Sequence, residues 1–187
     1  PRRRLEAEAI RDSMLAVSGR LDRTIGGPPI DPHRLHTDPD RSLVSGPVDG
    51  LGRRSLYIKM TLIDPPRFLA IFNQPMPRFT VGKRDRTTVP EQALALLNDP
   101  FVTAMAKVWG ERMAGETGRG LEAGIADMFR TAVGRPPQPA EVERLATVAR
   151  ACAAARVIAP ERLPTSAVVW QDVAHAIFTM QEFSHVE

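Results

Sequence analysis

The polar side chains best suited to binding chemistry gather between residues 84 and 99. They are Arg84, Arg86, Thr87, Thr88, Gln92, Asn98 and Asp99. An apolar run with helical spacing begins inside this segment, so Arg84 and Arg86 come shortly before a predicted helix N-terminus. The first N–H groups of a helix are free and carry a partial positive charge, and nearby arginines add to the attraction for an anion. The pattern indicates a candidate site for an anionic group or a glycan.

Six residues would form this site if the fold brings them together. They are Arg11, Arg53, Arg54, Arg84, Thr87 and Gln92, roofed by the Gly/Pro-rich stretch 24–52. Guanidinium groups match carboxylates and sulfates with two parallel hydrogen bonds, so the set favours an anionic glycan. In the alternative interpretation the arginines neutralise Asp12, Asp85 and Asp99 as internal ion pairs. The sequence leaves both interpretations open.

The same segment carries signals for the ends of two helices. Thr88, followed three residues later by Glu91, predicts a capping box, and Asn98 can adopt the left-handed conformation that ends a helix. Asp99 and Pro100 are typical of the N-cap and first position of a following helix. Capping therefore accounts for part of the polar group and does not account for its arginines.

The polar residues at the end of the first predicted helix have a similar ambiguity. They are Arg11, Asp12, Ser18, Arg20 and Asp22. We expect an ion-paired scaffold that anchors the long loop, and the alternative is that they belong to the same anion site.

Two histidines offer donors for a metal ion. His33 and His36 lie near Asp38 and Asp40, and all four side chains are compatible with zinc. The imidazoles lie in a Pro-rich loop without a fixed third ligand, so we expect a solvated loop and no metal site.

Other reactive residue types lack a supporting context. Asp172 and His175 are one helical turn apart and could act as an acid and a base, but we expect a surface or interdomain contact. Ser18 and Ser45 lack the Gly-x-Ser-x-Gly sequence of serine hydrolases. Cys152 falls on the inner face of an Ala-rich helix, where we expect it in the core.

Helical periodicity dominates the elements that must position these residues. Apolar residues recur with helical spacing in the segments 2–17, 65–73, 88–98, 99–112, 120–133, 135–156 and 164–180. Gly19 and Gly134 are natural ends for two of these helices. The stretch 55–63 alternates polar and apolar residues and predicts the one strand, whereas 24–52 has no period and reads as a long loop.

These elements predict a mainly α fold. We expect a helical bundle of antiparallel hairpins joined by short turns, with one short strand or extended segment and the long Gly/Pro-rich loop. The chain of 187 residues is expected to form a single domain, 1–187, in which 86–187 is a helical subdomain.

Composition excludes several classes of function. The net charge is +3, and the basic residues are interspersed with acids, so no continuous basic face for nucleic acid is expected. Cys152 is the single cysteine, which excludes a Cys-x-x-Cys-His haem attachment in this chain. No run approaches the length of a membrane helix. The chain opens inside a helical pattern and without Met, so we expect a piece of a longer protein.

Four phrases together resemble a known family. They are RRLEAEAIRDSMLAVSGRLD at 3–22, RRSLYIKM at 53–60, RDRTTVPEQALALLNDPFV at 84–102 and GRPPQPAEVERL at 134–145. Their order and spacing are similar to the planctomycete domain of unknown function 1553, the C-terminal domain of planctomycete cytochrome c–associated proteins. The resemblance implies an extracytoplasmic module, periplasmic or on the cell surface, with a c-type cytochrome-like domain upstream. Haem c is then expected on that upstream domain and no cofactor in this chain. The resemblance supplies no catalytic residue.

Two functions from different classes follow. The first is a non-catalytic helical accessory or binding module that contacts upstream domains of the same polypeptide or an anionic glycan. The alternative is a hydrolase or lyase acting on a complex polysaccharide, with its acids among Asp12, Asp22, Asp85 and Asp99. Such an enzyme needs two carboxyl groups about 5–10 Å apart in one cleft.

Overall fold

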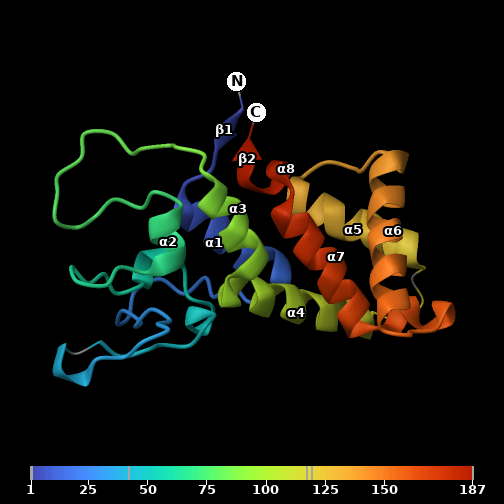
Figure 1. Cartoon of the computed structure of the whole chain (residues 1–187), viewed down its shortest axis with the longest axis horizontal. Helices are drawn as coiled ribbons and strands as arrows, with labels where there is room; N and C mark the ends of the chain where they lie inside the picture. Colours follow the sequence, from blue (N-terminus) through green and yellow to red (C-terminus); the bar gives the residue numbers. More distant parts are fainter. Residues whose placement is uncertain (1, 42, 117, 119, 187) are drawn as a thin grey trace.

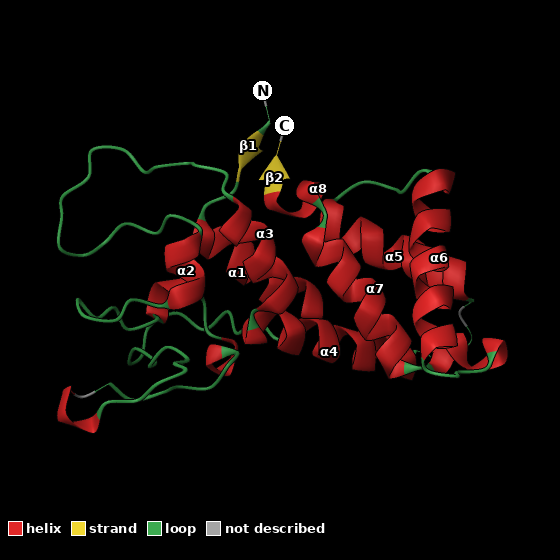
Figure 2. Cartoon of the chain, in the orientation of Figure 1, coloured by secondary structure: helices red, strands yellow, loops and turns green. Residues whose placement is uncertain are grey.

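The computed structural model describes residues 2–41, 43–116, 118 and 120–186 and confirms a mainly α fold (Figures 1 and 2). The α-helices are α1 (Ala7–Ser18), α2 (Arg67–Ile71), α3 (Pro90–Asn98), α4 (Pro100–Gly115), α5 (Leu121–Val133), α6 (Pro139–Ala155), α7 (Ala167–Thr179) and α8 (Gln181–Ser184). Short 3-10 helices are η1 (Pro39–Arg41), η2 (Gly50–Gly52), η3 (Ser55–Tyr57) and η4 (Pro160–Thr165). No described helix is long and apolar enough to cross a membrane.

The core forms where α4 and α7 pack against each other. Trp109 on α4 is fully buried, and its ring centroid lies 5.5 Å from that of Phe178 on α7. Gly110 permits this approach, because a Cβ at that position would lie only 2.6 Å from the carbonyl oxygen of Ala167. The helices α5 and α6 cover one side of this pair, while α1, α2 and α3 cover the other (Figure 1).

The two ends of the described chain are joined by a short antiparallel pair. β1 (Arg3–Arg4) pairs with β2 (His185–Val186), so Arg3 lies opposite Val186 and Arg4 opposite His185 (Figure 1). The first helix therefore begins at Ala7 and not at residue 2, because the residues before it are extended. Gly19 ends α1 in the left-handed conformation, as predicted, and Gly134 does the same for α5.

The predicted strand at 55–63 is wrong. Residues Ser55–Tyr57 form η3, and the extended part makes only an isolated parallel bridge between Ile58 and Ile30. Ile58 is buried, but Leu56 is 72% exposed, so the alternating pattern does not define one buried face. Among the described residues no neighbouring strand runs along this segment, which is why the alternation does not produce a sheet.

The helix ends predicted for residues 88–101 are only partly confirmed. Pro90 occupies the first position of α3, so Val89 is the N-cap, and Thr88 lies one residue too early to cap the helix. Asn98 keeps a helical conformation instead of the left-handed one, and its amide donates to the carbonyl oxygen of Leu94 at 3.0 Å. The second half of the prediction is confirmed, because the Asp99 carboxylate accepts a hydrogen bond from the backbone N–H of Phe101 at 2.9 Å.

The described residues of the Gly/Pro-rich stretch 24–52 are irregular apart from η1 and η2, and they form a loop layer together with 53–66 beside α1 and α2 (Figure 2). Gly52 has a φ of 75°, and a Cβ there would meet the carbonyl oxygen of Arg20 at 2.1 Å. The residue must therefore be glycine for the loop to return against the end of α1, where Asp22 N–H donates to the Gly52 carbonyl.

Candidate functional site

A large cavity lies between the loop layer and the beginnings of α2 and α4. Its volume is about 490 Å³, within the range of small-molecule sites. The segments 30–38, 43–50 and 64–69 and residues 99–101 contribute its walls. The long loop therefore forms one wall of a hollow whose other wall is the helical body.

Arg34 fixes the loop wall. Arg34 is only 7% exposed, and its guanidinium donates to the carbonyl oxygens of Val44 and Asp64 at 3.2 and 2.7 Å. The same group makes an ion pair with the Asp64 carboxylate and donates to Thr61 Oγ1. Since buried donors must be satisfied, these bonds hold the segments 30–46 and 61–64 in one arrangement. The wall is preformed.

Arg11 fixes the inner end of the same layer to α1. Its Nη1 donates to the carbonyl oxygen of Arg53 and its Nη2 to that of Asp49, both at 2.9 Å. The guanidinium also lies 5.0 Å from the ring centroid of Phe101 and 3.5 Å from the Asp12 carboxylate. Burial lowers the pKa of Arg11, and the nearby carboxylates of Asp12 and Asp49 oppose that effect. Arg11 therefore anchors the long loop as expected, but through backbone carbonyls, because its ion pair with Asp12 lies within α1.

The floor of the cavity is apolar. Phe68 on α2 and Phe101 on α4 are buried and lie edge to face, with ring centroids 5.5 Å apart. Five prolines also line the hollow, Pro32, Pro47, Pro65, Pro66 and Pro100. Proline has a fixed φ and no N–H, so these walls are stiff and offer few backbone donors. Polar recognition must then come from side chains.

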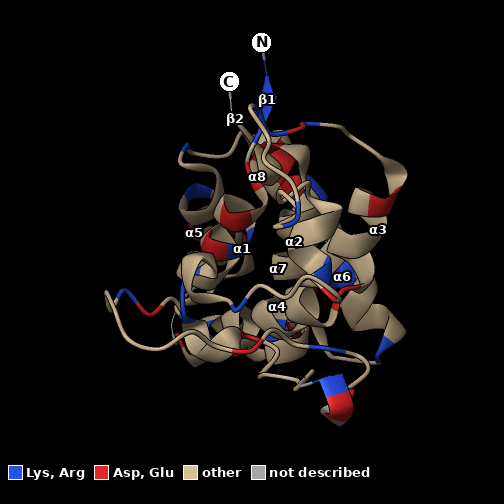
Figure 3. Cartoon of the chain, turned by 90° about the vertical axis from the view of Figure 1, so that its left-hand side faces the viewer, with Lys and Arg blue, Asp and Glu red and all other residues tan. Residues whose placement is uncertain are grey.

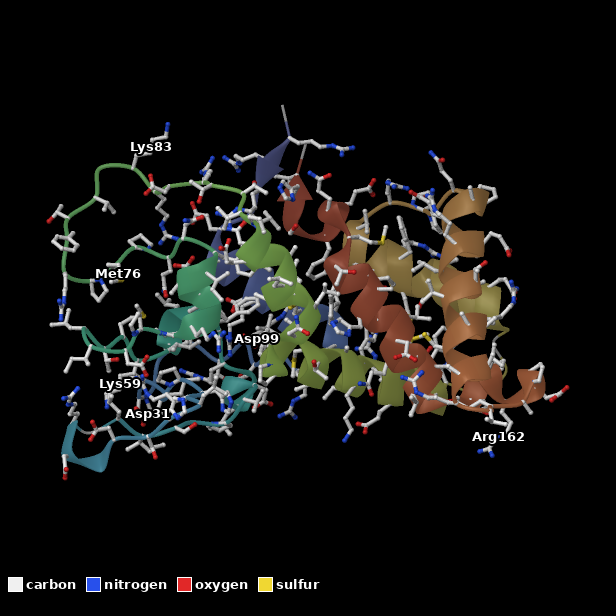
Figure 4. The ribbon with its side chains drawn as sticks, in the orientation of Figure 1. Asp31, Lys59, Met76, Lys83, Asp99 and Arg162 are labelled. Atoms are coloured by element: carbon white, nitrogen blue, oxygen red, sulfur yellow. The ribbon has the colours of Figure 1, made fainter. Side chains whose placement is uncertain are left out.

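Among the polar side chains that line this cavity, Asp99, Arg67 and His33 interact electrostatically. Asp99 lies at the start of α4, in the interior between the loop layer and the helices (Figure 4). Burial raises the pKa of Asp99, against the hydrogen bond from Phe101 N–H and the charges of Arg67 and His33. Within the described part of the chain, the side chains of Arg67 and His33 make no hydrogen bond or ion pair, which leaves them open to a ligand.

The remaining charged groups of the wall are already paired. Asp31 lies 3.3 Å from the Lys59 ammonium, and the two appear together in the loop layer (Figure 4). Asp38 pairs with Arg41 across 3.3 Å. No three His, Cys, Asp or Glu residues of the described chain are arranged to hold a metal ion, although His33 and His36 both line the cavity.

The structure divides the six sequence-predicted binding residues between two places. The first group is Arg11, Arg53 and Arg54, at the inner end of the loop layer. The Arg53 guanidinium lies 3.9 Å from the ring centroid of Tyr57, and it donates to the carbonyl oxygen of Gly26. Arg53 also lies 3.7 Å from Asp22, and Arg54 is the N-cap residue of η3.

The second group is Arg84, Thr87 and Gln92, beside the start of α1. Arg84 donates to Glu8 at 2.8 Å and lies 3.1 Å from Glu6. Gln92 is buried, and its amide donates to the backbone carbonyls of Ile71 and Thr87. Of the six residues, Arg11 alone is among the described residues that line the large cavity. The six therefore do not share one pocket, and the ligand that each group would bind stays a prediction.

Arg11, Arg53 and Arg84 have acidic partners, as the alternative interpretation expected, but of the predicted acids they meet, in the described chain, Asp12 and neither Asp85 nor Asp99. Arg84 meets Glu6 and Glu8 instead of Asp85. Asp99 has no ion pair in the described chain and faces the cavity instead. A glutamate 76 residues away along the chain could not be assigned to Arg84 from local spacing.

The other candidates have structural partners. Asp172 forms an ion pair with Arg156, and His175 Nε2 lies 3.0 Å from the carbonyl oxygen of Leu96. His175 and Asp172 are therefore engaged with different neighbours and do not form an acid–base pair. Cys152 is half-buried, so it is less enclosed than the core position predicted for it. Partial burial still raises the pKa of its thiol.

Arg34, Asp64 and Arg67 contribute to the cavity and were missed in the sequence. The signal that could have found Arg67 is local, because Pro65 and Pro66 directly precede it and mark the start of α2. The pairing of Arg34 with Asp64 spans 30 residues and has no local signature.

Residues 1–149 match the family described as "Protein of unknown function (DUF1553)". The chain belongs to this family. No curated protein and no solved structure matches the chain. The region matched by the DUF1553 family contains the whole loop layer, α1 to α5 and most of α6, so every residue of the large cavity lies inside it.

Proposed function

We propose that this DUF1553 chain is a non-catalytic binding module of an exported multidomain bacterial protein. The resemblance of its four phrases to planctomycete cytochrome c–associated proteins supports a parent protein that carries a haem c domain upstream of this chain. It also supports an extracytoplasmic location, in the periplasm or on the cell surface. The module's own contribution is recognition of a ligand by the cavity under the loop layer.

The single observation that carries this proposal is the preformed wall held by Arg34. An irregular loop of this length would normally lose much conformational freedom when it orders around a ligand. Here Arg34 and Arg11 hold the loop before any ligand arrives, so little of that entropy remains to be lost on binding. A stiff, hollow loop layer above an apolar floor favours a binding site over a simple connection between helices.

A saccharide with a carboxylate group fits the chemistry of the cavity. The Arg67 guanidinium can pair with the carboxylate, while His33 and Asp99 can exchange hydrogen bonds with hydroxyl groups. The apolar floor at Phe68 and Phe101 would accept the less polar face of a sugar ring. We therefore place the anionic glycan in this cavity, which shares only Arg11 with the set predicted from the sequence.

Titration of the chain with uronic acid oligosaccharides and with neutral oligosaccharides of equal length tests the proposal. Chemical-shift changes should map to the cavity wall for the uronic acids. Arg67→Ala should weaken that binding about tenfold or more, because it removes a charge-assisted pair. Arg162→Ala is the matched control, an exposed arginine at the opposite end of the molecule (Figure 4). Equal affinities for the parent and Arg67→Ala would contradict the proposed site.

One observation favours a second candidate, a polysaccharide hydrolase or lyase. Of the four acids considered from the sequence, Asp99 is the one that lines the cavity, and burial raises its pKa as an acid catalyst requires. Asp12 instead accepts hydrogen bonds from the backbone and hydroxyl of Ser55. The test is whether the chain releases reducing ends from uronic acid polymers and whether Asp99→Asn abolishes that release. Both results together would favour an enzyme and contradict the proposal of a non-catalytic binding module.

A further inference from the structure

A long arm, residues 74–86, projects from the body between α2 and α3. It leaves the end of α2, turns back on the outer side of the molecule and returns to the start of α3 (Figures 1 and 2). The side chains of Met76 and Lys83 lie on it, well away from the helices (Figure 4). A turn at its outer end is closed by the Phe79 N–H, which donates to the Met76 carbonyl at 3.2 Å.

The outer part of the arm exposes large apolar side chains. Phe79 is 69% exposed, Val81 49% and Met76 46%. Exposure of these three side chains to water is unfavourable, because the free energy falls when an apolar side chain moves from water into an apolar environment. The segment 60–65 lies on the same side of the molecule and exposes Leu62 and Ile63 (Figure 1). The arm and the segment 60–65 therefore both present apolar side chains to solvent.

Cations flank the apolar residues of the arm. Arg78 precedes Phe79 directly and Lys83 follows it, and in the described chain neither side chain has an ion pair or hydrogen bond. The arm contains four basic residues and one acidic residue. Figure 3 turns this side of the molecule toward the viewer. The projecting part of the arm thus combines positive charge with exposed apolar surface.

The end of the arm that leads into α3 is fixed to the body, whereas in the described chain the outer part of the arm is not. Arg84 pairs with Glu8, and Arg86 lies 3.8 Å from Glu6. Thr87 exchanges hydrogen bonds with the Asn73 side chain at the base. The base is therefore held by α1 and by the end of α2, and residues 75–83 are the part presented outward.

We propose that the arm docks the protein on a lipid surface that carries anionic headgroups. Phe79, Met76 and Val81 enter the boundary between headgroups and acyl chains, while Arg78 and Lys83 pair with the phosphate groups. Charge complementarity selects this partner, because unpaired cations beside an exposed aromatic side chain match an anionic interface in both charge and polarity. A narrow projection can enter such a surface without a complementary groove. This docking is separate from ligand binding in the cavity.

Co-sedimentation of the intact chain with vesicles tests the proposal. Vesicles of phosphatidylcholine mixed with phosphatidylglycerol should retain the chain, and vesicles of phosphatidylcholine alone should retain much less. Lys83→Glu should lower the partition coefficient by about fivefold or more, because each cation near an anionic membrane contributes about that factor. Arg162→Glu is the matched control at the opposite end of the molecule and should leave partitioning unchanged. No retention by the phosphatidylglycerol vesicles would overturn the proposal.

The apolar contribution needs its own variants. Phe79→Ser should reduce partitioning by about tenfold, whereas Val157→Ser, at an exposed valine after α6, should have no effect. Phe79→Trp should shift its emission to shorter wavelength on the anionic vesicles, and the native Trp109 and Trp170 are buried and constant. Dextran sulfate serves as a soluble anionic polymer. If Lys83→Glu weakens binding to dextran sulfate as much as binding to vesicles, and the emission does not shift on vesicles, the arm binds an anionic polymer. That result would overturn the lipid proposal.

Discussion

The guanidinium of Arg34 donates a 2.7 Å hydrogen bond to the backbone carbonyl of Asp64 and also pairs with the carboxylate of the same residue. One side chain thus joins two loop segments that are 30 residues apart. The cavity exists because this connection holds its outer wall away from α2 and α4. The described wall contains neither a sheet nor a long helix, and the other hydrogen bonds of its segment 30–46, such as Gly46 N–H to the Pro32 carbonyl, do not reach residue 64.

Arg34→Met should destabilise the fold by about 2–3 kcal/mol, because the carbonyls of Val44 and Asp64 lose their donors in a buried place. Chemical denaturation measures the change, and hydrogen exchange should accelerate in residues 32–46. Arg41→Met is the control, since Arg41 is exposed and pairs with the partly exposed Asp38. A loss as large in Arg41→Met would show that Arg34 has no special part in holding the wall.

Asp99→Ala should reduce the free energy of unfolding by about 1 kcal/mol through loss of the α4 cap. Thr88→Ala should leave it unchanged within error, because Val89 and not Thr88 is the N-cap of α3. Urea denaturation of the two variants beside the parent decides the matter. A larger effect at Thr88 than at Asp99 would restore the cap predicted from the sequence.

Gly110→Ala should destabilise the protein by about 1–3 kcal/mol, because the added methyl group would overlap the backbone of α7. Gly115→Ala lies on the same helix with open space around it and should change stability by less than about 1 kcal/mol. Thermal unfolding of both variants gives the comparison. Similar stabilities would mean that α4 and α7 are farther apart than the structure places them.

Acid should weaken the fold through Glu141. Hydrogen bonding from Arg135 lowers the pKa of Glu141 to about 2, from 4.5 in its ordinary state. Because the folded-state pKa is depressed, the carboxylate stabilises the fold above pH 4.5, and this contribution disappears as the pH falls from 4.5 toward 2. Glu141→Gln should flatten the pH dependence of stability in that window, whereas Glu111→Gln on the exposed side of α4 should not. Parallel curves for Glu141→Gln and the parent would refute this assignment.

The sequence by itself determined the features that depend on near neighbours. Gly19 and Gly134 end their helices because left-handed backbone favours glycine, and Asp99 caps α4 because its carboxylate reaches an N–H two residues ahead. Thr88 shows the limit of even this local logic, because Pro90 fixes the helix start one residue later than the Thr-x-x-Glu pattern predicts. The mainly α fold follows from helical periodicity over most of the chain.

Only the tertiary structure decided which distant groups meet. The alternation at 55–63 predicts a strand, but a strand needs a neighbour for its N–H and carbonyl groups, and the fold supplies only the bridge from Ile58 to Ile30. By sequence alone Arg84 could pair with any nearby acid, and its actual partner is Glu8 because the fold places α1 beside it. The cavity depends in the same way on Arg34 meeting Asp64. Such contacts depend on the path of the whole chain, and spacing along the sequence does not encode that path locally.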